Sequence, residues 1–248
     1  DELMALLTEI ISRPESHPRI AQMYYLRCQL ALADPETTEL AEADARYLLE
    51  QFPGLSGITS VYRLLAYAAL QRDPPRYRVA ADYLLDLRER SSDPAKVVQA
   101  NRLIGDCYFL NRDYANAVDF YESAIAGAGP ESSSANVRLR LVISQIRSGR
   151  SEAALANIDR ADFAGRMGEA DRWRDSMPEG AIGPAESARL KSELLLLKSQ
   201  SMLALDEIEA AFKVIATIRA DFRENVAAER TYFTEAAYRA SVDDFGAA

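Results

Sequence analysis

The sequence predicts an all-α protein. Leu, Ala, Arg and Glu at helical spacing dominate its 248 residues, and the alternating Val, Ile and Thr runs that form strands are missing. The 10 prolines fall between the periodic segments and not inside them. With 48% hydrophobic and 27% charged residues, a chain of this length can bury a sizeable core without disulfides. We therefore expect one continuous helical domain over residues 1–248.

The first helix is predicted to end before Pro14, because the residue preceding a proline disfavours the helical backbone. The apolar residues upstream follow steps of three and one, which place them on one helical face: Leu3, Leu6, Leu7, Ile10 and Ile11. Another helix is expected over residues 227–240. We expect these two as a leading and a trailing helix on either side of the central part of the chain.

The clearest internal repeat lies in residues 100–130. Small and aromatic residues follow one another there at steps of three, nine, four and three: Gly105, Tyr108, Ala117, Tyr121 and Ala124. This pattern resembles the tetratricopeptide repeat (TPR), a helix–turn–helix unit of about 34 residues in which a small residue lets the paired helices approach closely. Asn101 and Arg112 depart from the family pattern, which has a large aromatic residue and a glycine at these positions.

The same template fits four neighbouring segments. In each segment the second helix of the template carries a small residue at the same position near its start: Ala41, Ala80, Ala117, Ala154 and Ala211. The intervals between these residues are 39, 37, 37 and 57. The resemblance therefore implies a right-handed α-solenoid of about five TPR-like hairpins. The Phe52-Pro53 ending of one helix is also similar to that in bacterial envelope proteins of this repeat class, including outer-membrane assembly lipoproteins of the BamD type.

The long last interval contains an insertion at about residues 162–186, between the fourth and fifth repeats. A loop of this length is uncommon in a compact array. Its tryptophan, Trp173, either packs the insertion onto the solenoid or binds a partner. The insertion could also divide the chain into two domains at about residue 162, and Pro184 is expected to open a long helix after it.

Charge and hydropathy exclude several classes of partner. A net charge of −9 and a pI near 4.9 argue against a nucleic-acid or anionic-membrane surface. No apolar run reaches the ~18–20 residues that a membrane-spanning helix needs. The compartment stays open between the cytoplasm and the bacterial periplasm, and the sequence does not predict an oligomeric state.

Residues that carry catalysis are scarce. The sole histidine, His17, lies between two prolines in an expected turn, and Cys28 and Cys107 are expected to be small buried thiols. This set provides neither a nucleophile beside a base nor three or four soft metal ligands. The sequence therefore predicts a protein that is not an enzyme and that holds no metal or cofactor.

In a TPR-like solenoid the first helices of the repeats line a concave surface that holds a segment of a partner protein. The resemblance implies a largely apolar lining, with Arg72, Arg102 and Arg147 placed to orient an acidic or C-terminal group. The Lys/Asn set with which some family members clamp a C-terminal carboxylate is absent. The expected inward residues are Tyr62, Leu65, Arg72, Gln99, Arg102, Asp106, Phe109, Leu139, Ile143, Ile146 and Arg147.

Two alternatives stay open at this point. Leu139, Ile143 and Ile146 could belong to the core instead of a groove, if the repeats are irregular there. The function expected first is a non-catalytic protein–protein interaction scaffold. The alternative function is a helical accessory or regulatory domain of a larger enzyme or cell-envelope assembly.

Overall fold

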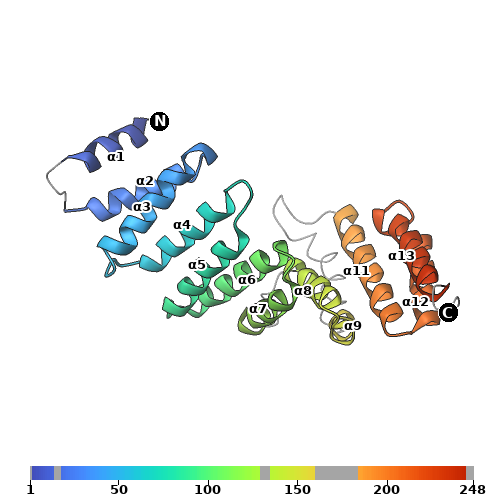
Figure 1. Cartoon of the computed structure of the whole chain (residues 1–248). Coiled ribbons are helices and arrows are strands. Elements are labelled where there is room, and N and C mark those ends of the chain that lie inside the picture. The colour runs from blue at the N-terminus through green and yellow to red at the C-terminus, as the bar shows by residue number, and fades with distance from the viewer. Residues whose placement is uncertain (1, 14–17, 129–134, 160–183, 244–248) are drawn as a thin grey trace. The chain divides into compact units, whose positions relative to one another are not determined.

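The computed structural model describes residues 2–13, 18–128, 135–159 and 184–243, and all regular structure in these segments is helical (Figure 1). The predicted all-α class is therefore confirmed. The chain forms two compact units, residues 1–129 and 130–248. No helix in the described segments is long and apolar enough to span a bilayer. A single continuous array across both units remains a prediction.

In the first unit each helix packs against the next one along the chain. The leading helix ends at Ser12, before Pro14 as predicted. The elements are α1 (Glu2–Ser12), α2 (Ile20–Ala31), a short 3₁₀ helix η1 (Pro35–Thr37), α3 (Thr38–Gln51), α4 (Ile58–Leu70), α5 (Tyr77–Arg90), α6 (Pro94–Leu110) and α7 (Tyr114–Ala128).

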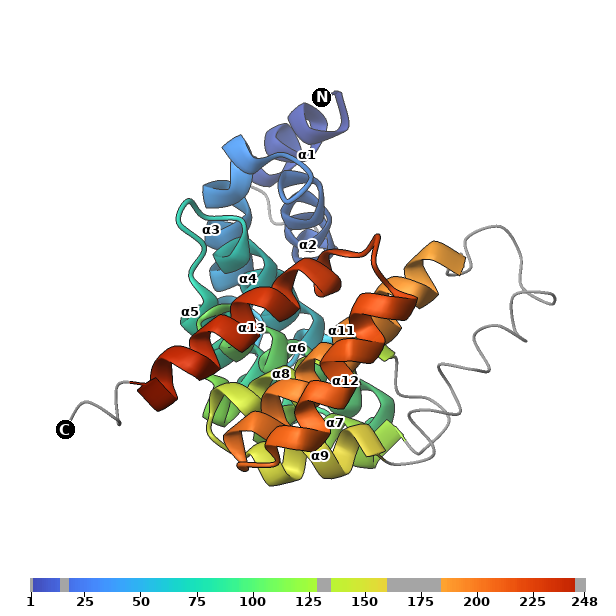
Figure 2. The ribbon, with the colours of Figure 1, turned by 90° about the vertical axis from the view of Figure 1, so that its right-hand side faces the viewer.

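The second unit continues the pattern of paired helices. Helix α8 packs on α9, α9 and α8 pack on α11, and α11 packs on both α12 and α13. Figure 2 shows α11, α12 and α13 side by side. The elements are α8 (Ala135–Arg147), α9 (Ser151–Asp159), α11 (Pro184–Ala204), α12 (Ile208–Asp221) and α13 (Val226–Asp243). Pro184 opens the long helix α11 as predicted, whereas residues 160–183 of the insertion, with Trp173, lie outside the described residues.

The five small residues predicted from the repeat occupy equivalent places in the fold. Each is the fourth residue of the second helix in its hairpin, and each is 0% exposed: Ala41, Ala80, Ala117, Ala154 and Ala211. A side chain larger than a methyl group would meet the neighbouring helix at these sites, because protein interiors are close-packed. The periodicity of the sequence thus marks five helical hairpins, with α1 before them and α13 after them.

Three of the hairpins turn in the same way. Arg112, Gly149 and Asp206 each lie five residues before the buried alanine, and their φ angles are +60°, +79° and +62°. The amide of the following residue donates a hydrogen bond to a carbonyl five residues earlier, as from Asp113 to Tyr108 at 2.9 Å. These are the left-handed residue and the backbone bond of a Schellman helix ending.

Arg112 carries a conformational cost that Gly149 avoids, since its Cβ disfavours the left-handed region. We expect Arg112→Gly to raise the free energy of unfolding by about 0.5–1 kcal/mol, and Gly149→Ala to lower it by a similar amount. Urea denaturation of both variants measures these changes. A loss of stability in Arg112→Gly would show that the arginine side chain stabilises the turn by more than its backbone costs.

The first three helices are joined by a buried ion pair. Arg27 of α2 donates from Nε to Oδ2 of Asp44 in α3 at 2.8 Å and from Nη2 to Oδ1 at 2.7 Å. Its third nitrogen, Nη1, donates to the Thr8 hydroxyl of α1 at 3.3 Å. The side chains of Arg27 and Asp44 are only 9% and 3% exposed, so the pair is bidentate and largely removed from water.

Gly105 lies where α6 and α7 touch. A Cβ added there would lie 2.8 Å from both Cδ1 and Cε1 of Tyr121, closer than real side-chain contacts allow. Tyr121 is fully buried, and its hydroxyl donates to Asp106 at 2.8 Å, so the ring is held on both sides. The predicted close approach of the two helices at Gly105 is confirmed.

Candidate functional site

The predicted groove residues of α4 and of the turn after it are mostly engaged within the protein. Tyr62 is half-buried, and the guanidinium carbon of Arg90 lies 5.3 Å from its ring centre. Leu65 is 1% exposed in the hydrophobic core, so its side chain cannot line an open groove. Arg72 donates to Glu39 at 2.8 Å and to Glu42 at 2.6 Å, and therefore ties this turn to α3.

The predicted residues of α6 lie closer to solvent. Gln99 is exposed, and Arg102 pairs with Asp106 at 3.6 Å while keeping 43% of its side chain exposed. Phe109 is half-buried, with its ring centre 5.7 Å from that of Tyr114. Its ring centre also lies 6.5 Å from that of Tyr121, so Phe109 packs beside the aromatic contact next to Gly105.

The predicted residues of α8 belong to the second unit. Leu139, Ile143 and Ile146 are half-buried and pack against a core cluster that includes Val142 and Leu197. This packing favours the interpretation of these three side chains as core. Arg147, at the last turn of α8, is exposed.

Neither cysteine has the properties of a nucleophile. Cys28 and Cys107 are buried free thiols, as predicted, and burial raises the pKa of each to about 12. A thiol with such a pKa stays protonated at neutral pH, and the thiolate is the reactive form. Among the described residues, no three His, Cys, Asp or Glu side chains gather as metal ligands would. His17 lies outside the described residues.

A hollow with a mainly apolar lining lies in the second unit, between α11 and α13. Its volume is about 640 Å³, and it is open to solvent. Helix α11 contributes Gln200, Leu203 and Ala204, and the remaining lining residues come from one side of α13: Arg230, Phe233, Thr234, Ala237, Tyr238 and Ser241. We call this hollow the α11–α13 groove.

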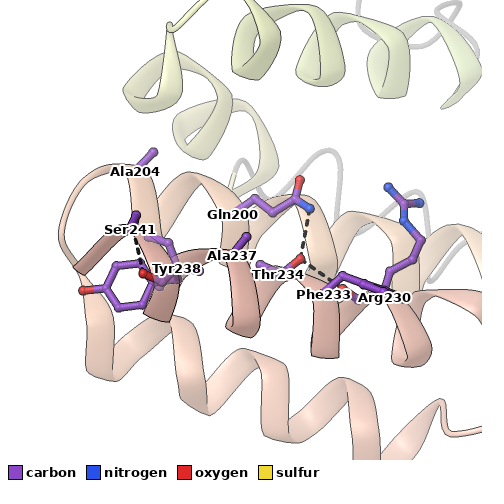
Figure 3. Close-up of a pocket in the computed structure, with 9 residues that line it drawn as sticks. Gln200, Ala204, Arg230, Phe233, Thr234, Ala237, Tyr238 and Ser241 are labelled. Carbon is purple, nitrogen blue, oxygen red and sulfur yellow. Dashed lines mark hydrogen bonds between the residues drawn. The ribbon is translucent and has the colours of Figure 1, made fainter. Parts of the chain in front are cut away.

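The two ends of the α11–α13 groove differ in character (Figure 3). Phe233 lies at one end with 76% of its surface exposed, next to Arg230. Tyr238 and Ser241 lie at the other end, near Ala204. Between them Gln200 donates to the Thr234 hydroxyl at 3.3 Å, which joins the two walls. The groove is therefore an apolar trough with a cation at one end.

Helix α13 is held in place by α12. Arg219 donates to Glu235 at 2.8 Å and to the hydroxyl of buried Thr231 at 2.8 Å, and its guanidinium carbon lies 3.9 Å from the centre of the Tyr232 ring. Tyr238 is supported by Phe212 of α12, with ring centres 6.1 Å apart and nearly perpendicular planes. The α13 wall of the groove is thus held in place by its contacts with α12.

This attachment is expected to depend on pH. Hydrogen bonds from Arg219 and then from Arg239 hold the pKa of Glu235 below its ordinary value. The stability it contributes is fully present above the ordinary carboxyl pKa and is lost as the pH falls through the lowered pKa of the folded state. We expect Glu235→Gln to lower the melting temperature at neutral pH and to have a vanishing effect in acid. A difference that stays constant over this range would contradict the prediction.

When the repeat template is aligned on Ala211, some of the positions that it predicts to face inward fall on the α11 wall of this groove. Ser199 lies twelve residues before Ala211, as Gly105 lies twelve before Ala117, and Ser199 is 0% exposed. In this register Gln200 and Leu203 correspond to the predicted inward residues Asp106 and Phe109. The inward residues predicted from the sequence end at Arg147, before the insertion, and therefore include no residue of the groove. Extending the register backward from Ala211 would have found its α11 wall.

The polar groups that line the groove are hydroxyls, one amide and the guanidinium of Arg230. Its nine lining residues include no carboxylate, imidazole, thiol or amine that could act as a general acid, a base or an activated nucleophile. The sequence matches no known protein-family model, and no curated protein is similar to it.

Proposed function

We propose that the chain is a non-catalytic, TPR-like protein-binding module, and that its α11–α13 groove holds an apolar segment of a partner protein. The observation that carries this proposal is Phe233, which lies 76% exposed at the mouth of an apolar trough. Large apolar side chains that line an exposed hollow are typical of interaction sites. The recurring buried alanines of the five hairpins support the TPR-like part of the proposal.

The exposed side of α13 is unusually apolar for a helix that faces water. Val226 is 68% exposed, and Val226, Phe233 and Ala240 follow one another at intervals of seven residues, with exposed Ala236 and Ala237 between them. Helical repeats normally cover such a side with another element, or carry polar residues there. A partner helix or extended segment would bury these side chains in the same way.

Arg230 places a positive charge at one end of the groove. In the described part of the chain its guanidinium makes no hydrogen bond or ion pair, although the protein has 38 acidic residues. A guanidinium binds a carboxylate through two parallel hydrogen bonds. We therefore expect the partner segment to place its apolar residues along α13 and an acidic group at the end marked by Arg230.

Selection of peptides against the purified protein tests this function. We expect selected peptides to combine an apolar anchor with an acidic residue, and Phe233→Ser to weaken their binding by about tenfold or more, because a buried Phe contributes roughly 1.5–3 kcal/mol. Leu6→Ser is the matched control, since Leu6 is an exposed apolar residue of the other unit. Equal loss of binding in both variants, or none in Phe233→Ser, would reject the groove as the site.

A further inference from the structure

The leading helix α1 is apolar on two sides. On one side Met4 packs against the buried cluster formed by α2, α3 and α4, and Leu7 is 5% exposed. Leu3 and Leu6 lie outside that contact, with 48% and 50% of their surfaces exposed. The apolar residues that helical spacing predicts for a single face of this helix are therefore divided between a core side and a solvent side.

The apolar residues on the solvent side of α1 form a narrow seam. Leu3, Leu6 and half-buried Ile10 follow one another at steps of three and four, which is the spacing with which paired helices contact each other. We call these three residues the α1 seam. A single exposed leucine needs no partner, but a helix that is apolar on both sides is typical of a buried helix.

Three charged residues lie along one edge of the α1 seam. Glu2, Glu9 and Arg13 follow one another at steps of seven and four, so they share one side of the helix. All three are exposed, and Arg13 donates to Glu9 at 2.7 Å. The edge thus begins with an acidic residue and ends with a cation. This order makes the edge complementary to itself when a second copy of the helix runs in the opposite direction.

We propose that α1 pairs with α1 of a second copy of the chain, antiparallel and about a twofold axis near Leu6. In this arrangement Leu3 of each copy contacts Ile10 of the other, and the two Leu6 side chains pack beside the axis. Equivalent edges of two antiparallel helices face each other, so Glu2 of one copy lies within about one helical turn of Arg13 of the other. The opposed helix dipoles add to the attraction.

Charge disfavours the two other ways of covering the α1 seam. Helices that lie on a lipid surface carry Lys and Arg beside their apolar side, whereas this edge has two acids and one arginine in a chain with a net charge of −9. A parallel pair would bring the acidic starts of both helices together, and like charges repel. The observations therefore favour a second copy over a membrane, and the antiparallel pair over the parallel one.

The proposed interface is small, so the dimer is expected to be weak. Helix α1 has 11 residues and therefore spans about 16 Å. Its seam buries less than the roughly 1,200 Å² of total surface at which stable interfaces begin. We therefore expect a dissociation constant between about 10 μM and 1 mM, and a dimer that forms only as the protein concentration rises.

Sedimentation velocity of the whole chain, at concentrations above and below this range, tests the proposal. The mass should rise from 27.5 kDa toward twice that value. Leu3→Ser/Leu6→Ser should weaken dimerisation by about tenfold or more, because the apolar surface that it buries is lost. Leu110→Ser is the matched control and should leave the dimer unchanged, since Leu110 is also 50% exposed but lies on α6.

Exchange of charges tests the antiparallel orientation. Glu2→Arg and Arg13→Glu should each weaken dimerisation by about threefold or more, because each creates two like-charge contacts across the twofold axis. The double variant Glu2→Arg/Arg13→Glu restores opposite charges and should dimerise like the native chain. Circular dichroism of each variant shows whether its helices are intact.

Three results would overturn the proposal: a monomeric mass at every concentration, a dimer that survives Leu3→Ser/Leu6→Ser, or a double charge variant that dimerises no better than the single ones. The α1 seam and the α11–α13 groove lie in different units, so Leu6→Ser remains a control for peptide binding in the groove. A photoreactive residue at position 6 is expected to link two copies of the chain. Each proposal can therefore fail without the other.

Discussion

Replacing Asp44 by Ala is expected to lower the free energy of unfolding by about 3–5 kcal/mol, because the change leaves the charge of Arg27 buried without its partner. Both hydrogen bonds between the two side chains are lost, at 2.7 and 2.8 Å in the native protein. The effect should be far larger than that of an exposed pair such as Arg13–Glu9, whose removal should cost less than about 1 kcal/mol. Urea denaturation followed by circular dichroism measures both changes.

The double variant Arg27→Met/Asp44→Leu distinguishes the effect of the charges on stability from the effect of side-chain packing. Replacing a buried pair by apolar side chains of similar volume is often neutral or stabilising. We therefore expect the double variant to be more stable than Asp44→Ala alone. A double variant as unstable as the single one would show that packing, and not an unpaired charge, explains the loss.

The second large effect is expected at Gly105. Leucine at this position would force the fully buried ring of Tyr121 out of its place between α6 and α7. Overpacking of this kind lowers the free energy of unfolding by about 1–3 kcal/mol. Gly54→Leu is the control, because a Cβ at Gly54 would meet no atom within 4 Å. A raised melting temperature in Gly105→Leu would contradict the close contact of the two helices.

Much of the fold follows from the repeat pattern of small residues. A buried alanine at the start of each second helix is a strong signal, because only a small side chain fits where two helices touch. The sequence gives less indication of the turns after α6 and α11. Arg112 and Asp206 adopt the left-handed conformation without glycine, so the sequence marks only Gly149 with the expected residue.

The candidate site was predicted less well than the fold. Helical spacing indicates which side of a helix an apolar residue occupies, but it does not separate a core side from a groove side. Leu65 was expected in the groove and lies in the core, and Arg72 was expected to be available and pairs with two glutamates. The exposure of Phe233 depends on how α13 packs on α12, through contacts such as Arg219–Glu235 that the repeat template does not contain.

Photo-crosslinking in cells that naturally contain the protein tests the central claim most directly. A photoreactive amino acid replaces Phe233 or Ala237 in the groove, and Leu6 on α1 serves as the control position. We predict a covalent adduct with the same partner protein from positions 233 and 237, and none with that protein from position 6. Adducts that are the same at all three positions, or none at 233 and 237, would contradict a partner segment bound in the α11–α13 groove.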